Sequence, residues 1–210
     1  MNVIFFKRLF WGKDFPLARL SGAALLLMAS DRLAHALTVT GALVWVYCLL
    51  SLALFAGERF FPRQGRRWAL AFLSSFIAGI YFLLIWIVSP YCALQTFFVI
   101  PLVPLLCISS EIFFKNNTSG LKDTVFTSAC EALTYGTLIV IFSLIREPFG
   151  FSSLSLPGGS QGIVLLFDGD SQSILPIRII AGSSGALLLL GYLTGLYRHY
   201  KNIYSPEEKE

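Results

Sequence analysis

Residues 100–111 read Ile-Pro-Leu-Val-Pro-Leu-Leu-Cys-Ile-Ser-Ser-Glu, and this stretch decides how the rest of the chain is interpreted. It is apolar enough for a membrane, yet Pro101 and Pro104 remove two backbone donors and prevent a regular helix. Irregular backbone at membrane depth is tolerated only where protein or a cavity covers it, and it often marks a binding site. The thiol of Cys107 is therefore a candidate ligand. A proline-kinked packing helix with an inert thiol is the alternative interpretation.

Charge is absent from a long central part of the chain. Residues 68–110 contain no charged side chain, and this run is long enough for two membrane crossings at roughly 20 residues each. Charged residues make up 13% of the sequence, whereas about a quarter is usual in a soluble domain. We therefore expect an integral membrane protein with a single bundle, because no polar stretch is large enough for a second domain.

Apolar segments predict six transmembrane helices in a domain over residues 20–197. The first, Leu20–Ser30, is too short to span alone and is expected to be half of a broken helix that Asp31 and Arg32 interrupt. Asp31 and Arg32 either pair with each other or lie where the chain meets water. The other expected spans are residues 36–57, 68–88, 93–114, 124–145 and 179–197, and the fourth contains the break described above.

The two ends of the chain are expected to lie outside the bundle. Residues 1–19 mix basic and aromatic side chains, as an amphipathic segment at the cytoplasmic membrane surface does, and residues 198–210 form a tail. A cleaved signal peptide, with residues 34–36 as its cleavage box, is the alternative for the N-terminal region.

The distribution of Lys and Arg predicts the orientation. With six spans and a cytoplasmic N-terminus, 13 of the 16 basic residues fall in cytoplasmic segments, and Arg32, Arg146 and Arg178 are the exceptions. This asymmetry follows the positive-inside rule and favours six spans with both termini in the cytoplasm. No basic patch of the kind that binds nucleic acid is present.

A weak internal repeat relates the two halves. Residues 26–30, Leu-Leu-Met-Ala-Ser, resemble residues 105–109, Leu-Leu-Cys-Ile-Ser, and each opens a set of three spans. Two three-span units in series have opposite orientations. The expected fold is therefore all-α, an inverted 3+3 repeat whose first and fourth helices are broken half-helices.

Residues 146–178 form a long connection rich in Gly, Ser and Pro, which is expected to be an external loop with a functional or partner-binding role. Arg146 and Glu147 are interpreted as an interfacial anchor that positions this loop. Asp168 and Asp170 have the spacing of some calcium ligands, but no further ligand pattern follows and a plain turn is favoured.

A few further side chains could carry chemistry. Glu131 lies within the fifth span, where it could shuttle a proton or line an ion path, or could lie near the cytoplasmic interface. Glu111 and Lys115 are expected to pair at a helix end. His35 is expected to be solvated or to lie at a helix end. The other three cysteines, Cys48, Cys92 and Cys130, have no metal-ligand spacing and are interpreted as apolar filler.

Three motifs resemble the small membrane subunits of the Rnf and Na+-pumping NADH:quinone oxidoreductase (Nqr) complexes, closest to the E-type Rnf and D-type Nqr subunits. Residues 11–16, Trp-Gly-Lys-Asp-Phe-Pro, followed by residues 20–30 are similar to the tryptophan–proline entry and first half-helix of that family. Residues 100–107 resemble its Ile-Pro-Leu-Ile-x-x-Asn-Cys motif. Residues 144–154 resemble its Ile-Arg-Glu-Leu-Phe-Gly motif, so the resemblance spans about residues 10–197.

The resemblance implies a fold, a partner and a cofactor. The family has six spans in an inverted repeat, and two such subunits of opposite topology together bind a [2Fe–2S] cluster through two cysteines from each. Cys107 matches the second family cysteine and is the candidate iron ligand. The first family cysteine falls at Ala24 or Leu25, neither of which can bind iron. Either the cluster has an unusual ligand in place of this cysteine or the subunit has lost the metal.

The sequence thus predicts a membrane subunit of a redox-driven, ion-translocating electron-transport complex, either a transmembrane electron relay or its structural scaffold. Its partners would be a homologous six-helix subunit of opposite topology, other subunits of the complex and the lipid bilayer. This chain alone would not be an enzyme. The alternatives are a small secondary transporter and a cofactor-free membrane scaffold protein.

Overall fold

A computed structural model describes residues 27–57, 65–110, 113, 121–158, 162–168, 180 and 182–204. The described part is mostly helical, with one small two-stranded sheet. The elements in chain order are η2 (Leu27–Asp31), α3 (Leu33–Ala56), α4 (Arg66–Val88), α5 (Pro90–Thr96), η3 (Ile100–Leu102), α6 (Val103–Ser109), α7 (Leu121–Phe151), β1 (Ser153–Pro157), β2 (Ile163–Asp168) and α9 (Ser183–Tyr204). The predicted N-terminal segment, residues 1–19, and most of the predicted first span lie outside the described residues.

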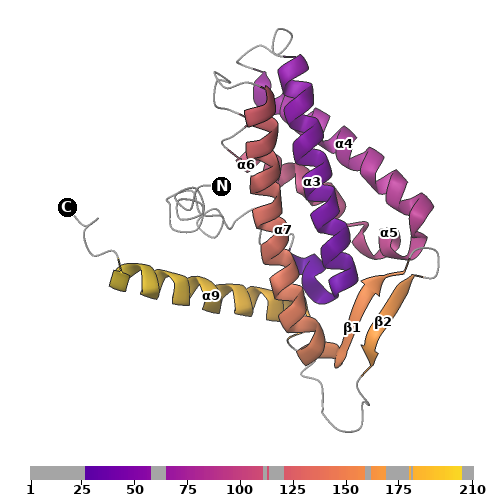
Figure 1. Ribbon diagram of the computed structural model, residues 1–210, viewed down its shortest axis with the longest axis vertical. Helices are drawn as coiled ribbons and strands as arrows, with labels where there is room; N and C mark the ends of the chain where they lie inside the picture. Colours follow the sequence, from indigo (N-terminus) through magenta and orange to yellow (C-terminus); the bar gives the residue numbers. More distant parts are fainter. Residues whose placement is uncertain are drawn as a thin grey trace.

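The two long helices α3 and α7 pack against each other along the middle of the molecule (Figure 1). The helix α4 and the broken segment α5–η3–α6 pack beside α3, and the hairpin β1–β2 lies at the end where α3 begins and α7 ends (Figure 1). One continuous apolar core joins these helices. It includes Val39, Leu43 and Leu50 of α3, Leu70 of α4, Ile100, Val103 and Leu106 of the broken segment, and Ile139 and Phe142 of α7.

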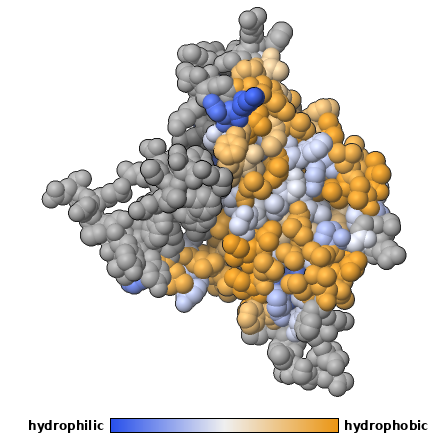
Figure 2. Space-filling view, in the orientation of Figure 1, coloured by the Kyte–Doolittle hydropathy of each residue, from blue (hydrophilic) through white to orange (hydrophobic). Residues whose placement is uncertain are grey.

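Three described helices, α3, α4 and α7, are long and apolar enough to cross a membrane. The helix α5 and the segment Ile100–Ser109 form a bent pair, with an angle of 51° at the break, which brings the number to four if the pair is one span. Large apolar side chains cover the outer face of α4, where Trp68, Phe72 and Phe76 are more than two-thirds exposed. Apolar surface is broad in the space-filling view as well (Figure 2). Multiple apolar helices of this kind indicate a multi-pass membrane protein.

The predictions for the middle of the chain are confirmed. The second and third predicted spans correspond to α3 and α4, and the fifth lies within α7. The predicted break in the fourth span occurs at the expected residues, because η3 carries Pro101 and α6 carries Pro104, each in its first turn. A proline is tolerated there since the first amides of a helix have no intrahelical acceptor.

The last predicted span is less complete than expected. The helix α9 begins at Ser183, four residues after the start of the predicted span, and within the described residues its apolar part, Ser183–Leu196, is shorter than those of α3, α4 and α7. Among the described elements, it packs chiefly against η2. The described residues therefore support three to four crossings rather than all six.

The predicted external loop is partly wrong. The helix α7 continues past Arg146 to Phe151 and ends at Ser152, whose φ of 52° is the left-handed conformation common just after a helix. The antiparallel hairpin follows, with Ser153 paired to Asp168 and Pro157 to Ile163. Asp168 therefore ends a strand, and Asp170 lies outside the described residues.

The close approach of α3 and α7 gives a first prediction. A methyl group on Gly136 would collide with the side chain of Thr40, whereas one on Gly79 of α4 would meet nothing within 4 Å. Gly136→Ala should lower the free energy of unfolding by about 1–3 kcal/mol. Gly79→Ala should be neutral or stabilising, because Ala favours helix by about 1 kcal/mol. The measurement is the thermal unfolding midpoint in detergent.

The control for this prediction is a rescue. Thr40→Ser removes the colliding methyl group and keeps the hydroxyl that donates to Ala36 O. Thr40→Ser should therefore restore most of the stability lost in Gly136→Ala. Equal unfolding midpoints for Gly136→Ala and Gly79→Ala would contradict the close contact between Gly136 of α7 and Thr40 of α3.

Candidate functional site

Cys107, the predicted iron ligand, lies in α6 and is fully buried in the apolar core. The two prolines make α6 a short, separate helix, which ends when the amide of Ser110 donates to Leu106 O at 3.0 Å and to Cys107 O at 3.3 Å. The break thus places a thiol in the short helix α6 and a serine directly after its C-terminal end.

Polar side chains from three helices gather next to this thiol. The hydroxyl of Ser110 donates to the carboxylate of Glu131 on α7, with distances of 3.1 and 3.0 Å to its two oxygens. Tyr47 of α3 is fully buried, and its hydroxyl lies within electrostatic reach of Cys107, Glu131 and Tyr135. We call Tyr47, Cys107, Ser110, Glu131 and Tyr135 the inner polar cluster. Tyr47 and Tyr135 were not predicted, because only the fold brings them to the thiol.

The inner polar cluster does not fit a [2Fe–2S] centre shared between two chains. The sulfur of Cys107 has no exposed surface, and its helix α6 packs against α4 and α3 of the same chain. A shared cluster would need this sulfur at a surface that the partner can reach. Among the described residues, no group of three or more His, Cys, Asp or Glu side chains could hold a metal ion. The polar side chains that accompany Cys107 in the inner polar cluster belong to tyrosine, serine and glutamate, which are poor substitutes for thiolate as iron ligands.

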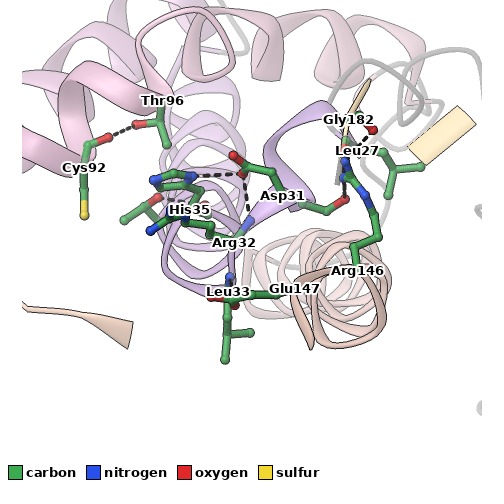
Figure 3. Close-up of polar contacts among 12 residues, drawn as sticks. Leu27, Asp31, Arg32, Leu33, His35, Cys92, Thr96, Arg146, Glu147 and Gly182 are labelled. Atoms are coloured by element: carbon green, nitrogen blue, oxygen red, sulfur yellow. Dashed lines mark hydrogen bonds and ion pairs between the residues drawn. The ribbon is translucent and has the colours of Figure 1, made fainter. Parts of the chain in front are cut away.

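A second set of polar contacts lies at the other end of the α3–α7 pair, next to the hairpin (Figure 3). Arg146 of α7 is fully buried there. Its Nη1 donates to Ser30 Oγ at 2.6 Å and to Leu27 O at 3.2 Å, both in η2. Its Nε donates to Ile180 O at 3.0 Å, and Nη2 donates to Gly182 O at 2.8 Å, next to the start of α9. One guanidinium therefore joins η2, α7 and the chain that enters α9.

Glu147 is also fully buried but points to a different element, the first turn of α3. Its Oε2 accepts a 2.7 Å hydrogen bond from the amide of Leu33. The residue before this helix, Arg32, provides no side-chain cap, so a carboxylate from α7 satisfies an amide that the helix leaves without an acceptor. A negative charge is favoured at this end by the helix dipole.

Asp31 and His35 form a third contact in this region. Nδ1 of His35 lies 2.9 Å from Asp31 Oδ1, which also accepts from the amide of Arg32 at 2.8 Å. The ring lies between Asp31 on one side and Cys92 and Thr96 of α5 on the other (Figure 3). We call Asp31, His35, Arg146 and Glu147, with Ser30, the outer polar cluster.

The outer polar cluster bears on three predictions. Arg146 and Glu147, predicted as an interfacial anchor, are both buried within α7, and Arg146 holds the chain that follows the long connection. Asp31 binds His35 and the backbone of Arg32, and the guanidinium of Arg32 lies 5.1 Å from the centre of the Phe151 ring. Of the two alternatives expected for His35, the structure shows the one at a helix end, and the side chain is buried there.

The remaining predicted residues stay apart from both clusters or outside the description. Cys92 is buried, Cys48 and Cys130 are half-buried, and all four cysteines are free thiols. Glu131, predicted inside the fifth span, is half-buried in α7 and belongs to the inner polar cluster. Glu111 and Lys115, and the residues 24 and 25 at the first family cysteine, lie outside the described residues. No protein-family model matches the chain, and no curated protein matches it either.

Arg146 gives the second prediction. Arg146→Met keeps most of the side-chain volume but removes the hydrogen bonds of the guanidinium to η2 and to the chain before α9. A hydrogen bond from a charged group contributes about 1.5–3 kcal/mol, so the loss of several should lower the free energy of unfolding by about 3 kcal/mol or more. Arg146→Lys should lie between wild type and Arg146→Met, because a lysine cannot reach acceptors in both η2 and the α9 entry at once.

Lys122→Met on the exposed start of α7 is the matched control and should change stability by less than about 0.5 kcal/mol. The measurement is chemical unfolding in mixed micelles, followed by tryptophan fluorescence. Equal stabilities for Arg146→Met and Lys122→Met would contradict the role of Arg146 as a connector.

Proposed function

We propose that this chain is a cluster-free, structural membrane subunit of an electron-transport, ion-translocating complex of the Rnf/Nqr kind. In this proposal it sits in a bacterial plasma membrane with its N-terminus in the cytoplasm, and it packs beside a homologous subunit of opposite topology. Neither the electrons nor the ion would pass through a metal centre that this chain binds.

The observation that carries the proposal is the relation between the two broken segments. Ser30 Oγ donates to Leu27 O at 2.6 Å, and Ser109 Oγ donates to Leu106 O at 2.8 Å. These serines occupy the same position in the two five-residue segments that the sequence aligns. The short helix η2 packs against α7, and α6 packs against α3, so each half-helix contacts the long central helix of the other half. This reciprocal packing of each half-helix on the central helix of the other half supports an inverted repeat.

The state of Cys107 favours a scaffold over an electron relay. A relay would need a thiol open toward the partner, whereas Cys107 is enclosed by the chain itself. A scaffold needs only a rigid bundle with a large apolar surface, which α4 offers through side chains such as Phe72 and Ile87.

A small secondary transporter is the second candidate, and one observation favours it. A cavity of about 160 Å³ lies between α4 and the break, lined by Ser75, Ala78, Gly79, Phe82, Phe97, Ile100, Pro101 and Pro104. Its lining is almost wholly apolar, so it would take a small apolar solute rather than an ion. Flux of such a solute through liposomes that contain only this chain would support this candidate.

The third prediction tests membership of a complex and the absence of a cluster together. The tagged chain, purified anaerobically from native membranes in mild detergent, should bring down a second multi-span membrane protein and redox subunits. After reduction with dithionite, low-temperature electron paramagnetic resonance should give the same iron–sulfur signals for wild type and for Cys107→Ala.

Cys92→Ala is the matched control, since Cys92 is also fully buried but belongs to α5, where its thiol contacts Gly162 O beside the hairpin. Recovery of the chain as a monomer would contradict membership of a complex. A [2Fe–2S] signal that is lost in Cys107→Ala but kept in Cys92→Ala, with the complex still assembled, would show a relay and overturn the scaffold proposal.

A further inference from the structure

The helix α4 lies at the edge of the described bundle. It packs on one side against α3 and against the broken segment α5–η3–α6, and α7 lies on the far side of α3 (Figure 1). At 1.5 Å per residue its 23 residues extend about 35 Å, close to the roughly 30 Å of the hydrocarbon layer. Residues 75–82, near the middle of α4, therefore lie well inside that layer.

The turn between α5 and η3 reaches the same depth. The ring of Phe97 in this turn packs against the ring of Phe82 of α4, with 5.6 Å between the ring centroids. Phe97 and Phe98 are 48% and 79% exposed, so the turn lies at the surface of the described chain. Pro101 has no amide hydrogen to donate to Phe97 O. None of the backbone hydrogen bonds described in this turn ends on Phe97 O or Phe98 O.

Lipid tails alone do not suit backbone of this kind. They offer no hydrogen-bond donor, and irregular backbone does not occur exposed to lipid in the hydrocarbon layer. A neighbouring transmembrane helix can satisfy such carbonyls through the hydroxyl or amide of a polar side chain. The exposed turn therefore requires a protein cover rather than a lipid one.

A cavity beside the turn shows where a neighbouring helix fits. The cavity of about 160 Å³ between α4 and the break has a buried floor that includes Ala78 and Ile100, and Ser75, Gly79 and Phe97 of its lining are exposed. A cavity of about 150 Å³ holds a molecule the size of benzene, so this one has room for a single leucine or phenylalanine side chain. Small residues one turn apart also let another helix approach closely.

We propose that the outward face of α4 and the α5–η3 turn form a docking surface for one transmembrane helix of a different membrane protein. That helix places a leucine or phenylalanine side chain in the cavity and a hydroxyl or amide side chain against the turn. It carries no charge at this level, since residues 68–110 offer no charged partner. The docking surface rests on the proposed function and deepens it, because it names the face of the chain that a membrane partner covers.

The first test uses a photo-crosslinking residue in the full-length chain in its native membrane. p-Benzoylphenylalanine replaces Phe98 in the turn or, as a control, Ile141 on the exposed side of the regular helix α7. Irradiation of the residue 98 variant should yield an adduct in which mass spectrometry identifies a transmembrane peptide of a different protein. The residue 141 variant should yield at least about fivefold less of that adduct.

The other outcomes of the crosslinking overturn the docking surface. Adducts of residue 98 with lipid alone, or with a second copy of this chain, would each contradict it. If the second multi-span protein still copurifies in such a sample, the docking surface is wrong while the proposed function stands. Recovery of the chain as a monomer would contradict both.

A second test fills the cavity. Gly79→Leu places a side chain in the space that the partner helix is proposed to use, and Gly191→Leu is the matched control on α9. An added Cβ meets nothing within 4 Å at either glycine. Gly79→Leu should lower the amount of copurified partner at least about threefold without lowering the thermal unfolding midpoint of the chain, and Gly191→Leu should change that amount less than twofold. Equal amounts of partner with the two variants would overturn the cavity as the point of docking.

Discussion

The buried guanidinium of Arg146 is the contact on which the outer end of the molecule depends. A charge inside a membrane protein must be solvated by the protein itself, and backbone carbonyls at broken or ending helices must find donors. Arg146 meets both needs at once, because its three nitrogens donate to carbonyls in η2 and before α9 and to the hydroxyl of Ser30. The short helix η2 and the backbone before α9 are thereby tied to the central helix α7.

At each end of the α3–α7 pair, a helix end has a hydrogen-bond donor that needs an acceptor. At the outer end, the first amide of α3 has no local cap and takes Glu147 from α7 as its acceptor. At the inner end, the half-helix α6 ends at Ser110, which donates to Glu131 of the same helix α7. In both places α7 supplies a carboxylate to a helix end. The polar residues of α7 therefore act as structural partners of the broken segments, which is what a scaffold requires.

Periodicity and composition predicted much of the helical framework. The uncharged run and the positions of its prolines were sufficient for α3, α4, the break and most of α7, because membrane thickness and proline geometry act locally. The sites were less predictable. Arg146 was assigned to an interface because a charge beside a polar connection usually lies there, whereas its acceptors Leu27 O and Ser30 Oγ are more than a hundred residues away in the chain. The last span was predicted to begin at residue 179, whereas the described helix α9 begins only at Ser183.

A double-mutant cycle between Ser30→Ala and Arg146→Met tests the central claim most directly, namely that Arg146 holds η2 against α7. The free energies of unfolding of the wild type, both single variants and the double variant are measured in the same mixed micelles. The 2.6 Å contact between Arg146 Nη1 and Ser30 Oγ predicts a coupling energy of about 1 kcal/mol or more, with the double variant less destabilised than the sum of the single ones. Additive effects, within about 0.3 kcal/mol, would mean that the two side chains do not interact and would contradict the account.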